Sequence, residues 1–143
     1  MPRVSRIPVD QKLAKDIEEN FLFLVSTLHR PEVIQQFFSD FLTNEEKTML
    51  SKRLMLHLML EKGYKQSEIQ SAVRMSRESI RVHESKWSRG SRTYKLILRK
   101  LVDHARDKEF WVKVEKALKP LELFVKARHD MKARAKFLSG EFD

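Results

Sequence analysis

The stretch that decides the fold is QSEIQSAVRMSRESIRVHESKWS, residues 66–88. Its apolar spacing predicts a short helix over residues 66–73 and a second helix over residues 76–89. Ser76 is a good N-terminal cap for the second helix, and Gly90 is a natural place for that helix to end. Two short helices joined by a turn of about three residues form a helix-turn-helix layout.

Such a pair of helices needs a small shared core. The residues expected to meet there are Ile69, Val73, Met75 and Ile80, with His83 as a further candidate. Two positions depart from the usual pattern, because Gln70 stands where a small residue is common and Arg74 stands where glycine usually opens the turn. We therefore expect Gln70 to turn outward and Arg74 to adopt a backbone conformation that glycine adopts at lower cost.

The outer face of the second helix is polar and suits a DNA groove. In a helix-turn-helix, the second helix enters the major groove with its N-terminal residues at the base edges. Arginine pairs with guanine through two hydrogen bonds, and glutamate accepts one from the cytosine amino group. We therefore predict base contacts from Arg77, Glu78 and Arg81. Predicted phosphate contacts, from the start of the first helix and from beyond the base-reading residues, are Gln66, Ser67, Lys86, Arg89 and Arg92.

Positive charge is concentrated around the same stretch. The chain carries a formal net charge of +9 at pH 7. Residues 64–106 hold eleven Lys and Arg against four Asp and Glu, which is +7 of that total. Residues 1–63 hold nine of each sign, and residues 107–143 hold nine basic against seven acidic residues. A localised basic excess is typical of proteins that bind polyanions, although a solvated surface accounts for it equally well.

Helical periodicity extends on both sides of this stretch. Thr43 and Glu46 form the T-x-x-E pattern of a reciprocal N-terminal cap. Pro120 is expected to break or kink a helix that begins at Asp107, because proline lacks a backbone N–H. The helices before Thr43 are apolar on more than one side, which predicts contact with partner helices. The further helices predicted are residues 10–28, 33–42, 43–63, 91–102, 107–119 and 121–138.

Composition supports a helical protein and excludes several classes. The chain has 143 residues, of which 41% are hydrophobic and 34% charged. This apolar fraction is sufficient for a hydrophobic core and does not indicate disorder. Only three glycines and four prolines are present, which disfavours β-sandwiches, barrels and Gly-rich nucleotide loops. The absence of cysteine excludes disulfide scaffolds, Cys-ligated zinc and thiol nucleophiles. No apolar run approaches the ~18 residues of a membrane span, and a soluble cytosolic protein is expected.

No catalytic or metal-binding constellation is apparent, and no enzyme activity is expected. The histidines, which are scattered without metal-ligand spacing, are His29, His57, His83, His104 and His129. His57 and Glu61 lie one helical turn apart, where a packed histidine is commoner than an acid–base pair. Trp87 and Trp111 are expected to seal helix junctions rather than to stack on bases.

A set of short motifs stands in a characteristic order. They are Leu42-Thr43-x-x-Glu46, Arg53, Leu60-x-x-Gly63, Gln66-Ser67-Glu68-Ile69 and Ser76-x-x-Ser79-Ile80. In order and spacing, the stretch from Leu42 to about Leu101 resembles the tryptophan-repressor superfamily of helix-turn-helix proteins. The resemblance implies an intertwined homodimer whose two reader helices address successive major grooves of double-stranded DNA.

The resemblance also implies a possible effector pocket at Thr43 and Arg53. In the founding repressor, two arginines hold an indole corepressor, and one of them matches Arg53. The other falls on Val82, and the glycine that follows it falls on His83. Valine neither stacks as a cation nor pairs with a carboxylate, so no tryptophan-like corepressor and no other cofactor is expected. A salt bridge from Arg53 to Glu45 or Glu46 is the more ordinary expectation.

The sequence therefore predicts an all-α protein with a flexible arm over residues 1–9, a Trp-repressor-like domain over residues 10–105 and a helical extension over residues 106–143. We expect a sequence-specific transcriptional regulator, acting as a repressor in the cytoplasm beside the nucleoid. The alternatives are a helical protein-interaction module, or a replication- or transposition-associated DNA binder with the same fold. The basic end of the extension suggests extra DNA or a membrane surface, but an ordinary solvated helix is commoner.

Overall fold

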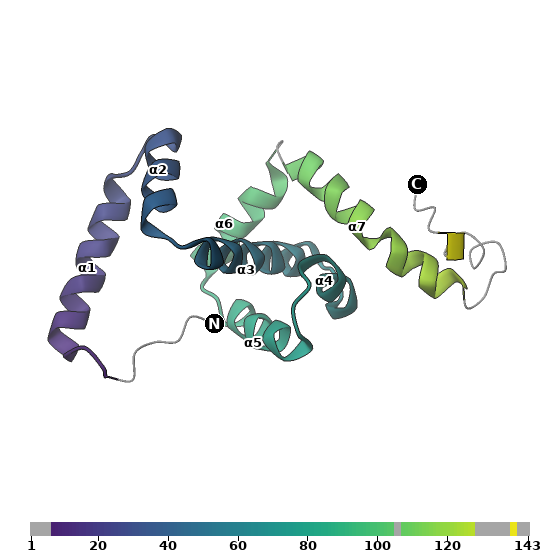
Figure 1. Ribbon diagram of the computed structural model, residues 1–143, viewed down its shortest axis with the longest axis horizontal. Helices are drawn as coiled ribbons and strands as arrows, with labels where there is room; N and C mark the ends of the chain where they lie inside the picture. Colours follow the sequence, from purple (N-terminus) through teal and green to yellow (C-terminus); the bar gives the residue numbers. More distant parts are fainter. Residues whose placement is uncertain (1–6, 105–106, 128–137, 140–143) are drawn as a thin grey trace. The chain divides into compact units, whose positions relative to one another are not determined.

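The computed structural model describes residues 7–104, 107–127 and 138–139. These residues form helices and no strand, which confirms the all-α class predicted from the sequence (Figure 1). The helices are α1 (Gln11–Thr27), α2 (Pro31–Phe41), α3 (Asn44–Lys62), α4 (Gln66–Val73), α5 (Arg77–Ser88), α6 (Arg92–Asp103) and α7 (Asp107–Ala127).

The helix starts are fixed by the caps that the sequence contains. The Asp10 carboxylate accepts the Lys12 N–H at 3.1 Å at the start of α1. Before α3, the Thr43 hydroxyl accepts the Glu46 N–H at 3.2 Å while Glu46 accepts the Thr43 N–H at 2.8 Å, as the T-x-x-E pattern predicts. Ser91 caps α6 by accepting the Tyr94 N–H at 3.1 Å. These side chains satisfy backbone donors that a helix leaves unpaired, which is why the predicted starts hold.

The chain divides into two compact units, residues 1–50 and residues 51–143. In the first unit, phenylalanines of α1 and α2 stack, with 5.7 Å between the ring centroids of Phe21 and Phe41 and 5.3 Å between those of Phe37 and Phe41. Neither α1 nor α2 buries any side chain completely. This unit therefore presents much apolar surface to its surroundings.

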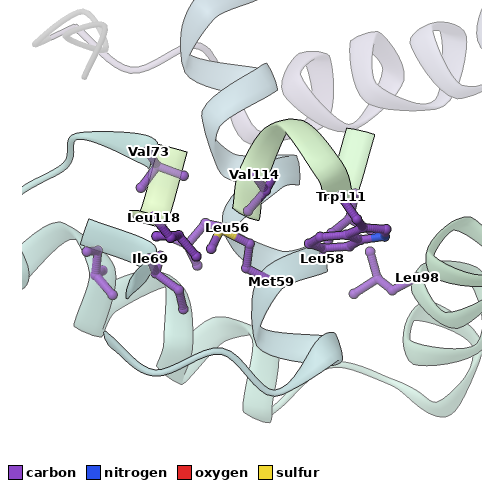
Figure 2. Packing of buried hydrophobic residues seen from close by; sticks show 10 residues of the cluster. Leu56, Leu58, Met59, Ile69, Val73, Leu98, Trp111, Val114 and Leu118 are labelled. Carbon is purple, nitrogen blue, oxygen red and sulfur yellow. The ribbon is translucent and has the colours of Figure 1, made fainter. Parts of the chain in front are cut away.

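The second unit has a continuous hydrophobic core built from α3 to α7. Helix α4 packs against both α5 and α7, and α7 also packs against α6. Figure 2 shows Leu118 of α7 beside Ile69 and Val73 of α4, with Trp111 of α7 beside Leu58 of α3. The buried hydrophobic residues are Leu56, Leu58, Met59, Ile69, Val73, Ile80, Leu98, Trp111, Val114 and Leu118.

Helix α7 runs through Pro120, so of the predicted break or kink at this residue the break is wrong. An interior proline removes one hydrogen bond and costs about 3 kcal/mol or more. The apolar face of α7 that packs on α4, with Trp111, Val114 and Leu118 buried, offsets this cost. The predicted reader helices thus share one core with the first part of the predicted extension. Most of the helix predicted over residues 121–138, and most of the arm predicted over residues 1–9, lie outside the described residues.

Candidate nucleic-acid interface

The α4–turn–α5 pair has the core predicted for a helix-turn-helix. Ile69, Val73 and Ile80 are at most 2% exposed, and Met75 packs against them. His83 is also buried. The predicted meeting of the two helices is therefore confirmed.

The turn between the helices depends on Arg74. Its backbone is left-handed, with φ 51° and ψ 54°, and its N–H donates to the Gln70 carbonyl at 3.0 Å. Arginine thus occupies the conformation that glycine adopts at lower cost, as expected from the sequence. Ser76 then caps α5 by accepting the Ser79 N–H at 3.2 Å. These contacts fix the direction in which α5 leaves the turn.

The first two turns of α5 present the predicted base-contacting residues to solvent. Arg77, Glu78 and Arg81 are all exposed. The Arg77 Nε lies within hydrogen-bonding distance of the Gln70 side-chain oxygen, at 3.4 Å. Gln70 is half-buried, so the expectation that it turns fully outward is only partly met, because its amide meets Arg77 across the turn.

A hollow of about 340 Å³ joins the start of α4 to the exposed face of α5. No acidic side chain is among the described residues that line it. The lining residues are Lys65, Gln66, Ser67, Gln70, Arg77, Ile80 and Arg81. The structure thus brings two predicted phosphate contacts and two predicted base contacts to one basic surface. Sequence reasoning missed Lys65, although its place in the basic stretch and directly before α4 was a usable signal.

Gln66 also connects the two helices. Its side-chain Nε2 donates to Glu84 Oε2 on α5 at 2.7 Å. This bond, together with the Arg77–Gln70 contact, ties the helices at two points on the exposed side of their shared core. Ser67 beside it remains exposed.

The other predicted phosphate contacts lie outside this hollow. Lys86 and Arg92 are exposed, on α5 and at the start of α6. Arg89 folds back along its own helix, where its Nε donates to the Ser85 carbonyl at 3.2 Å and its terminal nitrogen to the Ser85 hydroxyl at 2.7 Å. Their contact with DNA stays a prediction.

A buried histidine pair joins α3, which carries His57, to α5, which carries His83. The rings of His57 and His83 meet edge to face, with 5.6 Å between their centroids, and His57 Nδ1 shares a hydrogen bond with the Tyr94 hydroxyl. Burial, followed by the positive charges of His83, Arg53 and Lys86, lowers the pKa of His57 to about 4. Burial, followed by the positive charges of Arg53 and Lys86, lowers the pKa of His83. His57 is therefore neutral at pH 7 and packed in the core. Glu61 does not pair with it, because the Glu61 carboxylate accepts hydrogen bonds from Trp87 and Arg99.

The predicted effector residues have separate surroundings. Thr43 forms the reciprocal cap with Glu46. Arg53 lies beside the histidine pair, and its buried Nε has no hydrogen-bond partner among the described residues. The expected salt bridge from Arg53 to Glu45 or Glu46 is wrong. Positions seven or eight residues apart on one helix are separated by about 10 Å along its axis, well beyond the spacing of three or four residues at which helical ion pairs usually form.

Comparison with known families decides where this arrangement belongs. The sequence model of the Trp repressor protein family matches residues 18–102, which is more than half of the chain. The chain belongs to the Trp repressor family. No curated protein and no solved structure matches the chain significantly. Membership in this family, which is one of regulators rather than enzymes, and the helix-turn-helix geometry indicate a DNA-binding regulator.

The family match ends before α7 begins. The helix that completes the core beneath α4 therefore lies outside the region that matches the family. Within the described part of the chain, no helix has the length and apolar character that crossing a membrane requires.

Proposed function

We propose that this member of the Trp repressor family is a sequence-specific transcriptional repressor that reads double-stranded DNA with α5. The observation that carries the proposal is the basic surface formed by the hollow between α4 and α5 and the exposed first turns of α5. The side chains that line the hollow include both predicted phosphate contacts, Gln66 and Ser67, and predicted base contacts, Arg77 and Arg81. Proteins of this layout place the second helix in the major groove.

Each exposed residue has a role in this proposal. Arg77 and Arg81 pair with guanines, and Glu78 accepts from a cytosine amino group. Gln66 and Ser67 contact a phosphate at the start of α4, where helix N–H groups also favour anions. Phosphates beyond the other end of α5 are held by Lys86, Arg89 and Arg92.

We also propose that the DNA-binding form is a homodimer. Support comes from α1 and α2, in which no side chain is completely buried although both helices are rich in large apolar residues. The exposed apolar residues of these helices are Leu13, Ile17, Phe21, Leu22, Phe23, Leu24, Val33 and Phe41. Exposed apolar surface of this extent on a soluble chain marks an interaction site, and a second copy presents the matching surface.

The molar mass of the protein, measured by light scattering as it elutes from a size-exclusion column, tests whether it is a dimer. Phe23 is 71% exposed, so Phe23→Asp leaves the fold of one chain intact while placing a charge in the proposed interface. We expect this variant to elute as a monomer and to lose affinity for a two-half-site operator. Gln11→Asp adds the same charge at an exposed position at the start of α1 and is expected to stay dimeric. A monomeric wild-type protein would contradict the proposal.

A small-molecule effector is not part of the proposed mechanism. Val82 is exposed and apolar, and His83 packs on His57 instead of leaving open space beside Arg53. We therefore propose that the protein binds DNA constitutively. As a DNA-binding regulator, it is proposed to act in the cytoplasm, beside the nucleoid. Tryptophan and indole, added at millimolar concentration, are expected to leave operator affinity unchanged; a tenfold increase in affinity would contradict effector independence.

Selection from a random pool of duplexes tests sequence-specific binding. We expect recovery of a palindromic site, with half-sites one helical turn apart or a multiple of it. Arg77→Ala or Arg81→Ala then costs about 1–3 kcal/mol on the selected site, with little effect on unrelated duplexes. Equal losses on every duplex would remove the base-reading roles, and recovery of no sequence would favour a helical protein-interaction module.

A further inference from the structure

The carboxylate of Glu61 connects three helices of the second unit. The Glu61 side chain, on α3, is only 6% exposed. Its Oε1 accepts a hydrogen bond from Arg99 Nε of α6 at 2.7 Å, and its Oε2 accepts one from Trp87 Nε1 of α5 at 3.0 Å. Each oxygen therefore has a partner from a different helix.

Trp87 is held on a second side by Lys95 of α6. The Lys95 Nζ lies 4.8 Å from the centroid of the Trp87 ring and 3.4 Å from the Ser88 carbonyl oxygen. The indole also packs against the buried core. These contacts fasten the last turn of α5 to both α3 and α6.

The hydrogen bonds explain why a carboxylate is tolerated here. Burial alone raises the pKa of Glu61, but the bonds from Arg99 and Trp87 and the charges of Arg99 and Lys95 outweigh it, so the pKa is lowered. Charge-assisted hydrogen bonds are stronger than neutral ones, and a buried indole N–H without an acceptor is costly. The ionised carboxylate thus holds the indole in one orientation.

Because Trp87 lies at the opposite end of α5 from Arg77, a small rotation at Trp87 displaces Arg77 by a larger distance. Trp87 lies ten residues after Arg77, which is about 15 Å along a helix axis. A rotation of about 10° around the Trp87 end displaces the Arg77 end by roughly 2.5 Å, whereas binding constellations tolerate about 0.5 Å. The polar bonds from Arg77 to Gln70, at the base-reading end, and from Gln66 to Glu84, further along α5, hold α5 only against α4.

We propose that Glu61 is a positioning residue that sets, through Trp87, the angle at which α5 meets DNA. Arg99 and Lys95 then belong to this network and do not contact the DNA backbone, despite lying in the most basic part of the chain. The proposal rests on the proposed function, because it assigns the discrimination between DNA sequences to the orientation of α5.

Two substitutions separate positioning through Trp87 from the ion pair alone. Trp87→Phe keeps an aromatic ring and the Glu61–Arg99 pair but removes the indole donor. Glu61→Gln keeps an oxygen acceptor for Trp87 but removes the charge that pairs with Arg99. Each full-length variant is titrated by fluorescence anisotropy with the selected duplex and with a scrambled duplex. Urea denaturation first establishes that the variant is folded under the titration conditions. We expect Trp87→Phe to lower the ratio of the two affinities at least fivefold and Glu61→Gln to lower it less, with scrambled-duplex affinity within twofold of wild type.

A matched pair of charge deletions tests the role of Arg99. Arg99→Gln and Lys100→Gln remove one positive charge each from neighbouring positions on α6, and Lys100 is exposed. We expect Arg99→Gln to lower the discrimination ratio without changing the salt dependence on scrambled DNA, and Lys100→Gln to preserve the ratio. A decrease of about 0.9 in the steepness of the log–log salt slope for Arg99→Gln would show a phosphate contact and overturn its assignment.

The proposal and the proposed function fail separately. A wild-type protein that prefers no duplex overturns the proposed function. A wild-type protein that discriminates, with Trp87→Phe discriminating equally well, overturns the positioning role even when Trp87→Phe lowers the unfolding midpoint. In that case the network of Glu61, Trp87 and Arg99 serves stability only.

Discussion

Shortening Leu118 to alanine tests whether α7 belongs to the core of the DNA-binding unit. Leu118 is 3% exposed and lies beside Ile69 and Val73 of α4 (Figure 2). The change removes three buried carbon atoms, which corresponds to about 2.4 kcal/mol at ~0.8 kcal/mol each. An unfilled cavity adds roughly 1 kcal/mol, so we expect a loss of about 3–4 kcal/mol in the free energy of unfolding, within the range measured for such changes.

Urea denaturation followed by circular dichroism measures this loss, with Val112→Ala as the matched control. Val112 is on the same helix but 51% exposed, so its truncation is expected to cost less than about 0.5 kcal/mol. At the thermal midpoint, the Leu118→Ala loss corresponds to a decrease of more than about 12 °C for a unit of this size. Equal effects of Leu118→Ala and Val112→Ala would refute the packing of α7 on α4.

Further predictions follow from the turn, the histidine pair and the DNA-binding surface. Arg74→Gly relieves the strain of the left-handed backbone, and we expect it to raise the free energy of unfolding by at most about 1 kcal/mol. Urea denaturation measures the change, and a loss of more than about 1 kcal/mol would contradict this expectation. The pKa of His57 is lowered from 6.5 to about 4 in the folded state, so its neutral form contributes stability above pH 6.5 that is lost as the pH falls towards 4. Urea midpoints at pH 7 and pH 5 measure this loss, and we expect the difference between the two midpoints to be smaller for His57→Leu than for the wild type. An equal difference would contradict the role of His57. Lys86→Ala is expected to weaken selected and scrambled duplexes alike in anisotropy titrations, and a selective loss would show base reading instead.

Much of the fold was predictable because its determinants are local. The caps at Thr43, Ser76 and Ser91 and the apolar spacing around them depend on residues within one or two helical turns. The left-handed residue Arg74 was predictable for the same reason, since two helices joined by a short turn require a reversal there.

The contacts that the sequence did not reveal join residues far apart in the chain. Glu61 meets Trp87 and Arg99, which are 26 and 38 positions away. The interaction of His57 with Tyr94 spans 37 positions. Nothing in local periodicity specifies such pairs, and the continuation of α7 through Pro120 likewise depends on packing against α4 rather than on local propensity. For the candidate site, the outward face of α5 was predictable. The basic stretch pointed to Lys65 as well, but its place in the hollow depends on how α4 packs against α5.

The most direct test of the central claim is fluorescence anisotropy of the full-length protein on a random-sequence duplex at several salt concentrations. Each phosphate contact contributes about −0.9 to the slope of log affinity against log salt. With contacts from Lys86, Arg89 and Arg92, we predict a slope of about −3 for each protomer and roughly twice that for a dimer. Absence of binding even at low salt would contradict the account and would direct the search to a protein partner of the basic surface.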